Sequence, residues 1–219
     1  MTESRQRTKK LTSMAMLCAL AYLMMLVGRI PVTLFLKYDP KDIVIAIGGF
    51  LYGPVSAFVI SAVVAVIELP ISDTSYIGCV MNLISSAAFA CTAAYIYSKN
   101  RTLRGAVIGL VTGVLVMTGV MLLWNYFLTP IYMGYPREAV VDLLLPVFLP
   151  FNLLKGGLNA AFTMLIYKPV VSALRASGLV PEGQVHAQES RRVTIGVMLV
   201  SLLVLITCIL LVLVMKKVI

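Results

Sequence analysis

The sequence IVIAIGGFLYGPVSAFVISAVVAVI, residues 43–67, carries no Asp, Lys or Arg, and Gly53-Pro54 lies near its middle. Apolar stretches of about 20 residues are long enough to cross the ~30 Å hydrocarbon core of a bilayer as a helix. A glycine-proline pair favours a turn and removes a backbone donor, so these residues form either one kinked helix or a hairpin of two short helices. The choice between the two forms decides the topology of the whole chain.

The composition also places the chain in a membrane. Of its 219 residues, 60% are hydrophobic and 12% are charged, whereas soluble domains contain about 25% charged residues. Four irregularly spaced cysteines and the single His186 exclude a disulfide scaffold and most metal sites. The positive residues lie between the apolar stretches, so we expect no nucleic-acid partner. The sequence therefore predicts an all-α integral membrane protein without a metal site.

Further apolar stretches are long enough to be membrane helices: residues 11–28, 74–98, 105–136, 143–167 and 193–215. No Ala-x-Ala cleavage pattern follows the first stretch, so we expect a retained helix and not a signal peptide. With the 43–67 hairpin, these stretches predict a six-helix membrane domain over residues 1–176. A cytoplasmic linker over 177–192 and an additional C-terminal transmembrane helix over 193–219 follow it.

Charge favours the hairpin, because Lys and Arg collect on the cytoplasmic side of membrane proteins. A single crossing by residues 43–67 would place Lys99, Arg101 and Arg104 outside. A hairpin returns these residues to the side of the N-terminus. That side then holds eleven Lys or Arg (positions 5, 7, 9, 10, 99, 101, 104, 168, 175, 191 and 192) against three acids (3, 182 and 189). We therefore predict a multi-pass protein of the cell membrane with a cytoplasmic N-terminus.

Lys155 is the most informative polar residue, because a lysine at the centre of a membrane helix costs about 2.5–3.5 kcal/mol on insertion scales. Helical spacing places Asn152, Lys155 and Asn159 on one face of an otherwise apolar helix. A row of donors and acceptors on such a helix indicates a ligand cavity. The alternative is a lysine that pairs with a buried acid or extends to the membrane surface.

Asn125 lies among the aromatic residues Trp124, Tyr126 and Phe127, near the outer end of its helix. An amide flanked by aromatic rings suits a flat ligand with a polar edge. Trp and Tyr also form belts at membrane interfaces, and this is the alternative for the cluster.

Outer loops that are candidates for a lid are expected over residues 31–42, 70–78 and 129–146. We expect Asp42 to cap the N-terminus of the helix that follows it. Further polar groups on this side, available to Lys155 or to ligand hydroxyls, are Glu68, Asp73 and Asn82.

Several catalytic patterns are absent from the sequence. It contains no Gly-x-x-x-x-Gly-Lys-Ser/Thr loop, so the chain does not bind ATP in the P-loop manner. It contains neither His-Glu-x-x-His nor Gly-x-Ser-x-Gly, and no pair of intramembrane acids of the aspartyl-protease kind. We therefore do not expect an enzyme.

Four groups of motifs occur in order along the chain: Lys37-Tyr38-Asp39-Pro40-Lys41-Asp42 before residues 49–54, Met81-Asn82-Leu83-Ile84-Ser85, Asn125-Tyr126-Phe127 with Pro130-Ile131-Tyr132, and residues 150–156. With these motifs the chain resembles the riboflavin-specific substrate-binding (S) components of energy-coupling factor (ECF) vitamin transporters. The resemblance covers residues 10–175. The seventh helix is not part of the usual six.

The resemblance implies six helices around an outward-facing pocket that the first outer loop covers. It implies riboflavin as the transported ligand and no cofactor. The implied partners are a transmembrane coupling (T) subunit and two cytoplasmic ATPases. By resemblance, the substrate-binding residues are Asn125, Asn152, Lys155, Tyr38, Asp39 and Asn82. Ala15 and Ala19, four residues apart on the first helix, would face the T subunit.

Other functions remain open at this point. The protein could be an S component for another vitamin or for a flavin nucleotide, whose phosphate would need cations such as Lys37, Lys41 or Arg137. From a different class, it could be a membrane enzyme or a helical scaffold in which Lys155 and Asn152 have structural roles.

Overall fold

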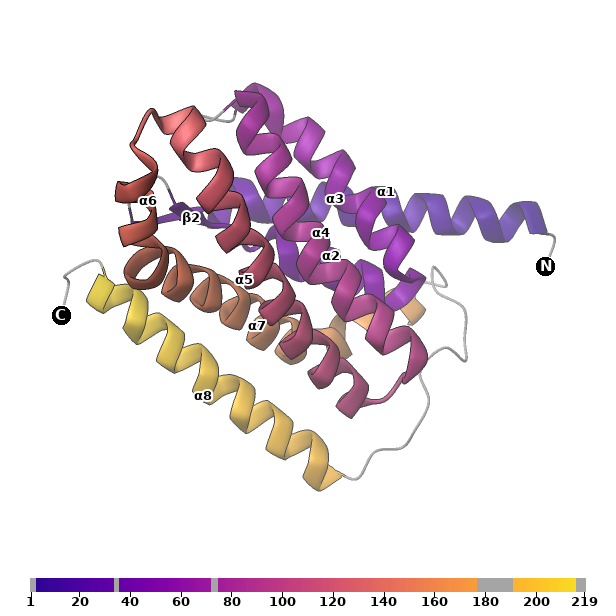
Figure 1. The fold of residues 1–219 in the computed structure, drawn as a ribbon. Helices are drawn as coiled ribbons and strands as arrows, with labels where there is room; N and C mark the ends of the chain where they lie inside the picture. The colour runs from indigo at the N-terminus through magenta and orange to yellow at the C-terminus, as the bar shows by residue number, and fades with distance from the viewer. Residues whose placement is uncertain (1–2, 34–35, 72–74, 177–190, 216–219) are drawn as a thin grey trace.

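The computed structural model describes residues 3–33, 36–71, 75–176 and 191–215. Its elements are, in chain order, α1 (Glu3–Gly28), β1 (Ile30–Thr33), β2 (Leu36–Tyr38), α2 (Lys41–Tyr52), α3 (Pro54–Glu68), η1 (Leu69–Ile71), α4 (Ser75–Lys99), α5 (Leu103–Met133), α6 (Arg137–Leu143), η2 (Leu144–Phe148), α7 (Leu149–Ala176) and α8 (Arg191–Met215). Within the described ranges, six segments are long and apolar enough to cross a membrane. The predicted helical membrane fold is confirmed, and the chain is a multi-pass membrane protein (Figure 1).

The Gly-Pro hairpin forms at the predicted position. α2 ends at Tyr52, α3 begins at Pro54, and Gly53 between them has a φ of 92°. This positive φ is costly for a residue with a Cβ, so it favours glycine. Pro54 suits the first turn of α3, because its missing N–H would have no partner within the helix. The two residue types together end one helix and start the next.

α2 occupies the centre of the bundle. It has 12 residues, which is about 18 Å of helix and too short to cross a bilayer. All its residues from Lys41 to Leu51 are buried, because α1, α3, α4 and α7 pack around it. Protein neighbours thus replace lipid around this helix, and its charged N-terminal end lies inside the molecule.

Two glycines of α5 allow this helix to approach α4 closely. A Cβ on Gly109 would lie 2.7 Å from the carbonyl oxygen of Ala93, and one on Gly113 would lie 2.6 Å from that of Phe89. Small residues allow such close backbone approach in membrane helix pairs. α7 then packs on α5 and α2 and completes the bundle.

Residues 129–146, predicted as an outer loop, are mostly helical. α5 continues through Pro130 to Met133, and α6 and η2 follow from Arg137. Only residues 134–136 separate these helices, where Gly134 with a φ of 67° ends α5 and Pro136 precedes α6. The glycine and prolines indicated a loop, but they mark helix ends here, and a proline is tolerated just before a helix.

Residues 31–42 contain a feature that the sequence did not predict, an antiparallel pair of strands between α1 and α2. In this β1–β2 ribbon, Ile30 pairs with Tyr38 and Pro31 pairs with Lys37, and the register is irregular between Pro31 and Thr33. In the remaining predicted loop, η1 and the first turns of α4 occupy much of residues 70–78. Asp73 lies outside the described residues.

α8 lies outside the bundle, along α7 (Figure 1). Only 6% of its membrane window is buried, against 28–39% in the other spans of the described chain. Most of its surface is therefore available to lipid. Of the predicted linker over 177–192, residues 177–190 lie outside the described residues.

Candidate functional site

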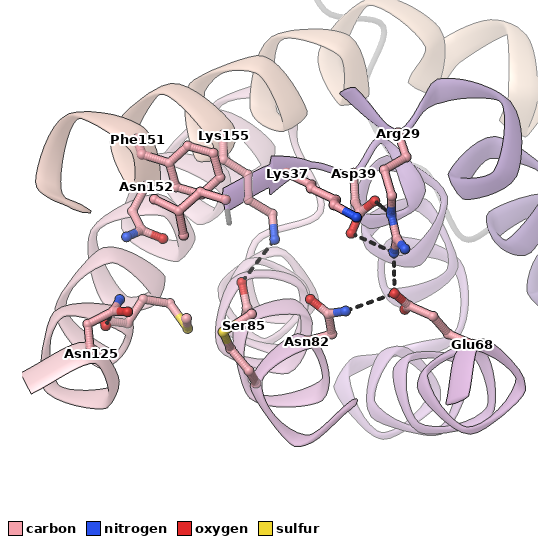
Figure 2. A pocket seen from close by; sticks show the side chains of 13 residues that line it. Arg29, Lys37, Asp39, Glu68, Asn82, Ser85, Asn125, Phe151, Asn152 and Lys155 are labelled. Atoms are coloured by element: carbon pink, nitrogen blue, oxygen red, sulfur yellow. Dashed lines mark hydrogen bonds and ion pairs between the residues drawn. The ribbon is translucent and has the colours of Figure 1, made fainter. Parts of the chain in front are cut away.

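A cavity of about 190 Å³ lies at the end of the bundle where α1, α3 and α5 end and α2, α4 and α7 begin (Figure 2). Its walls combine charged, amide and apolar side chains from five elements and two loops. The lining residues are Arg29, Leu36, Lys37, Asp39, Glu68, Met81, Asn82, Ser85, Met121, Asn125, Phe151, Asn152 and Lys155.

One wall is a network of buried ion pairs around Glu68, the last residue of α3. Arg29 donates to both Glu68 and Asp39, with 2.6 Å from Arg29 Nε to Asp39 Oδ1 (Figure 2). Lys41 Nζ lies 2.5 Å from Glu68 Oε2, and Asn82 Nδ2 donates to Glu68 Oε1 at 2.9 Å. Charges buried in this way are tolerated because each has an opposite charge and hydrogen bonds. The network joins α3 and α4 to the connection between α1 and α2.

This network shifts the pKa values of its members. Burial alone would raise the pKa of Asp39, but Lys41 and Arg29 outweigh it and hold that pKa below its usual value. Burial alone would lower the pKa of Arg29, but the Asp39 and Glu68 carboxylates raise it. The pair therefore stays charged across the physiological pH range.

Lys155 on α7 combines two roles that the sequence left open, because it pairs with a buried acid and also lines a cavity. Its Nζ lies 3.5 Å from Asp42 Oδ2 and donates to Ser85 Oγ at 3.2 Å, and the side chain also lines the cavity. Asp42 does not cap α2, because its buried carboxylate faces inward and accepts bonds from Ser86 Oγ at 2.5 Å and Asn159 Nδ2 at 3.2 Å. The capping prediction was wrong. Ser86, Asn159 and Lys155 together stabilise this carboxylate inside the bundle.

Two buried asparagines, Asn125 on α5 and Asn152 on α7, line the cavity together with Lys155. Asn125 Nδ2 donates to the Met121 carbonyl oxygen, and Asn152 Nδ2 donates to that of Phe148, both at 2.7 Å. An amide group has two N–H donors, so one such bond fixes the side chain and still leaves donor capacity. Both residues line the cavity, as does Asn82, whereas Asn159 lies deeper, on Asp42.

The aromatic residues next to Asn125 do not line this cavity. Trp124 belongs to a separate surface pocket, and the side chain of Phe127 is 52% exposed. Their placement fits the alternative of an aromatic belt at the membrane interface. The apolar wall of the cavity comes instead from Phe151, with Leu36, Met81 and Met121.

Tyr38 is the one predicted binding residue that does not line the cavity. Its ring packs among apolar residues of β1 and α7, and its hydroxyl is buried without a hydrogen-bond partner among the described residues. Burial, together with the carboxylates of Asp42 and Asp39, raises the pKa of this hydroxyl. Sequence reasoning missed Arg29, although a charge directly after an uncharged membrane stretch was a usable signal. It also missed Met121, which carries no such signal.

The family model for the substrate-specific component of ECF transporters matches residues 9–167. The chain belongs to this family. The riboflavin transporter RibU of Staphylococcus aureus is 26% identical over 179 residues, which cover 78% of this chain and 94% of that protein. The riboflavin transporter FmnP of Bacillus subtilis is 27% identical over 188 residues, covering 78% and 98%.

A solved S component of a bacterial ECF transporter has the same fold. It superposes with a TM-score of 0.67 at 26% identity and covers 77% of this chain and 99% of that chain. The present chain is thus a transporter component and not an enzyme, as the sequence predicted. The family match ends at residue 167, so α8 is an addition to the family domain.

A second cavity in the described chain, of about 450 Å³, lies between α5, α7 and α8. Its walls are apolar apart from Ser201, and they include Val111, Val200 and Val204. A single hydroxyl cannot orient a polar vitamin, so this cleft is not the candidate substrate site.

Proposed function

We propose that this S component binds riboflavin on the outer side of the membrane and delivers it inward together with a partner module. The observation that carries the proposal is the cavity, which places the amides of Asn125 and Asn152 and the ammonium of Lys155 around the apolar surface of Phe151. The riboflavin transporters among its relatives support the same ligand.

The chemistry of these walls matches the parts of riboflavin. Its tricyclic ring is flat and apolar, and needs apolar surface such as Phe151 and Met121 offer. Its pyrimidine edge carries donors and acceptors, and its ribityl chain carries hydroxyls, so both need amide and charged partners. Asn152 and Lys155 lie one helical turn apart on α7 and supply such partners on one face.

The volume of the cavity implies a movable wall. At about 190 Å³ it falls below the ~300 Å³ at the lower end of ordinary small-molecule sites. We infer that the cavity widens to admit the ligand. The two-stranded β1–β2 ribbon forms part of the wall, because its residues Leu36 and Lys37 line the cavity. This ribbon therefore takes the role of the lid that was expected in the first outer loop.

The charges around the cavity favour an uncharged ligand. In the described chain, Arg29, Lys41 and Lys155 lie against three carboxylates, those of Asp39, Glu68 and Asp42. A flavin phosphate would have to compete with these carboxylates for the cations. Lys37 also lines the cavity. Because cations bind phosphate groups, a flavin nucleotide is the second candidate ligand.

Charge also supports the orientation, with the cavity outside and the N-terminus in the cytoplasm. Arg5 and Arg7 are exposed near the start of α1, at the end of that helix away from the cavity. Lys10 Nζ lies 6.0 Å from the ring centroid of Tyr52, which places the α2–α3 turn at the same end. The cation-rich end is then cytoplasmic.

The partners follow from the family. We propose a T subunit in the membrane and two cytoplasmic ATPases, because the chain itself lacks a P-loop. Ala15 and Ala19 are both exposed on α1. Small exposed residues four positions apart allow a second helix to pack closely, so this face of α1 is where we place the T subunit.

A fluorescence titration of the purified protein tests the ligand. Riboflavin fluorescence should be quenched on binding, with saturation at micromolar protein or below, and riboflavin 5′-phosphate should bind more weakly. Tighter binding of the phosphate would favour the second candidate. If neither flavin binds at micromolar concentration, the proposed function is wrong.

A further inference from the structure

The added helix α8 reaches the wall of the cavity that we propose as a lid. α8 packs along α7 and contacts β1. Two of its side chains, Cys208 and Val212, pack against a buried apolar cluster that contains Val32 and Leu36 of the β1–β2 ribbon. A helix outside the family domain therefore touches the segment that covers the substrate site.

The cluster connects α8 to the cavity through shared residues. Leu36 and Phe151 are members of the cluster, and both residues also line the cavity. Leu36 is 5% exposed and Phe151 is 4% exposed. The apolar cluster against which Cys208 and Val212 pack is thus continuous with the wall of the ligand cavity.

The ribbon needs such support. Isolated two-stranded ribbons are marginally stable in water at best, and they depend on packing against other elements. β1 has four residues and β2 has three, and the register between them is irregular. Beyond the Arg29–Asp39 pair at its base, its position over the cavity therefore depends on the apolar cluster, to which α8 contributes.

α8 approaches α7 closely near Cys208. A Cβ on Gly157 of α7 would lie 3.2 Å from Cys208 Sγ, so this glycine allows the two helices to approach at this level. Nearer its N-terminal end, α8 borders the 450 Å³ cleft that it forms with α5 and α7, and Ser201 is buried there.

We propose that α8 is a built-in clamp that holds the β1–β2 ribbon over the substrate cavity and slows ligand release. Cys208 and Val212 are the positioning residues of this clamp, and they act through the apolar cluster that contains Val32 and Leu36 of the ribbon. The effect on ligand release rests on the proposed function, because it takes riboflavin as the ligand of the cavity. The effect on the ribbon does not depend on which ligand binds.

The test compares two pairs of substitutions in the full-length protein. Cys208→Ala with Val212→Ala removes the contacts with the cluster, while Ile209→Ala with Val214→Ala shortens two side chains of the same helix that are 43% and 58% exposed. The first pair should speed riboflavin dissociation, measured by stopped-flow fluorescence, by about three- to tenfold, as expected for loss of small partly buried apolar groups. The control pair should leave the rate at the wild-type value.

Hydrogen exchange supplies a second measurement that needs no ligand. Backbone amides of β2 should exchange several times faster in the first pair than in the control pair, while amides at the centres of α4 and α5 keep wild-type rates. Equal exchange of β2 in both pairs would overturn the clamp, and so would faster exchange throughout the bundle. If wild-type protein binds no riboflavin, the proposed function fails, and exchange in β2 alone still decides the clamp.

Discussion

A lysine buried beside a cavity has to satisfy its charge before a ligand arrives, and Lys155 does so with Asp42 and Ser85. The distance of 3.5 Å to the carboxylate is longer than the usual charged hydrogen bond of about 2.7–2.9 Å. The ammonium thus remains available to a ligand oxygen without leaving Asp42 unpaired, because Ser86 and Asn159 also donate to that carboxylate. This arrangement suits a site that is alternately empty and filled.

The first prediction concerns the polar pair on α7. Asn152→Ala and Lys155→Met each remove a proposed ligand contact, and loss of one hydrogen bond to a ligand costs about 1.5–3 kcal/mol where a charge is involved. We expect the Kd for riboflavin to rise roughly tenfold to a hundredfold in Lys155→Met, and about two- to tenfold in Asn152→Ala, where the lost hydrogen bond is neutral. Fluorescence titration measures this change.

Asn100→Ala and Lys99→Met are matched controls, because both residues are exposed at the other end of α4. They should bind as the wild type does. Unchanged affinity in Asn152→Ala and Lys155→Met, in protein that unfolds at the wild-type temperature, would remove these residues from the site.

The second prediction follows from the lowered pKa of Asp39. A carboxyl group with a lower pKa in the folded protein stabilises it above the unfolded pKa, and this contribution is lost as the pH falls through the folded value. With an ordinary value of about 3.9 for Asp, the Asp39 contribution should be constant from pH 7 to 5 and decline below about pH 4. Thermal unfolding in detergent across this range measures it.

Asp39→Asn should unfold at a lower temperature than the wild type at pH 7 and should lose less stability on acidification. Asp142→Asn is the control, because this residue is exposed on α6, and it should follow the wild type. A wild-type acid response in Asp39→Asn would show that the ion pairs around Asp39 contribute nothing to stability.

At the scale of elements, the hairpin of α2 and α3 could be predicted because a local signal, Gly53-Pro54, coincided with a charge pattern that constrained it. The row of Asn152 and Lys155 could be predicted for a similar reason, since helical periodicity within one element fixes which residues share a face. Both inferences use only signals that are readable along the chain, either local spacing or the side of the membrane on which charges collect.

The failures share the opposite property. Tyr38 and the aromatic residues beside Asn125 face away from the cavity, and their direction depends on how their elements turn toward others. The pairing of Arg29 with Glu68 joins residues 39 positions apart. Spacing within one element carries no information about such rotations or pairings, so one sequence does not reveal them.

The third prediction concerns the hairpin turn. Gly53 has a φ of 92° and a ψ of 173°, a region that is essentially restricted to glycine and costs other residues about 1–3 kcal/mol. Gly53→Ala should therefore lower the unfolding temperature, although a Cβ there would meet no atom within 4 Å. The loss would come from backbone strain alone.

Gly119→Ala is the matched control. A Cβ at this position also meets nothing within 4 Å, but Gly119 lies inside α5, where alanine is favoured over glycine by up to about 1 kcal/mol. This variant should be as stable as the wild type or more so. Equal stability of both variants would mean that the α2–α3 turn adapts to a residue with a Cβ.

At the scale of the whole molecule, the functions occupy different parts of the bundle. The cavity lies at one end, exposed cations lie at the other end of α1, and the exposed alanines of α1 lie between them. α8 packs on α7, whereas α1 packs on α2 and α3 (Figure 1). An added helix in this position leaves the proposed T-subunit face of α1 uncovered, which explains how a seventh helix is compatible with assembly.

The last prediction separates ligand capture from transport. Ala15→Trp and Ala19→Trp place a bulky ring on the exposed face of α1, where close approach of a partner helix needs small residues. Riboflavin binding to the purified variants should equal that of the wild type, since neither residue lines the cavity. Uptake of labelled riboflavin by cells that depend on this chain should fall by at least about tenfold, as expected when about 1.4 kcal/mol of association energy is lost.

Leu203→Trp controls for the added ring, because Leu203 is 65% exposed on α8 and lies away from the α1 face. It should retain both binding and uptake. Wild-type uptake by Ala19→Trp would exclude this face of α1 as the T-subunit contact, whereas loss of binding in the same variant would mean that α1 transmits packing changes to the cavity. Loss of uptake alone, with Leu203→Trp unaffected, is the result that the separation of capture from coupling requires.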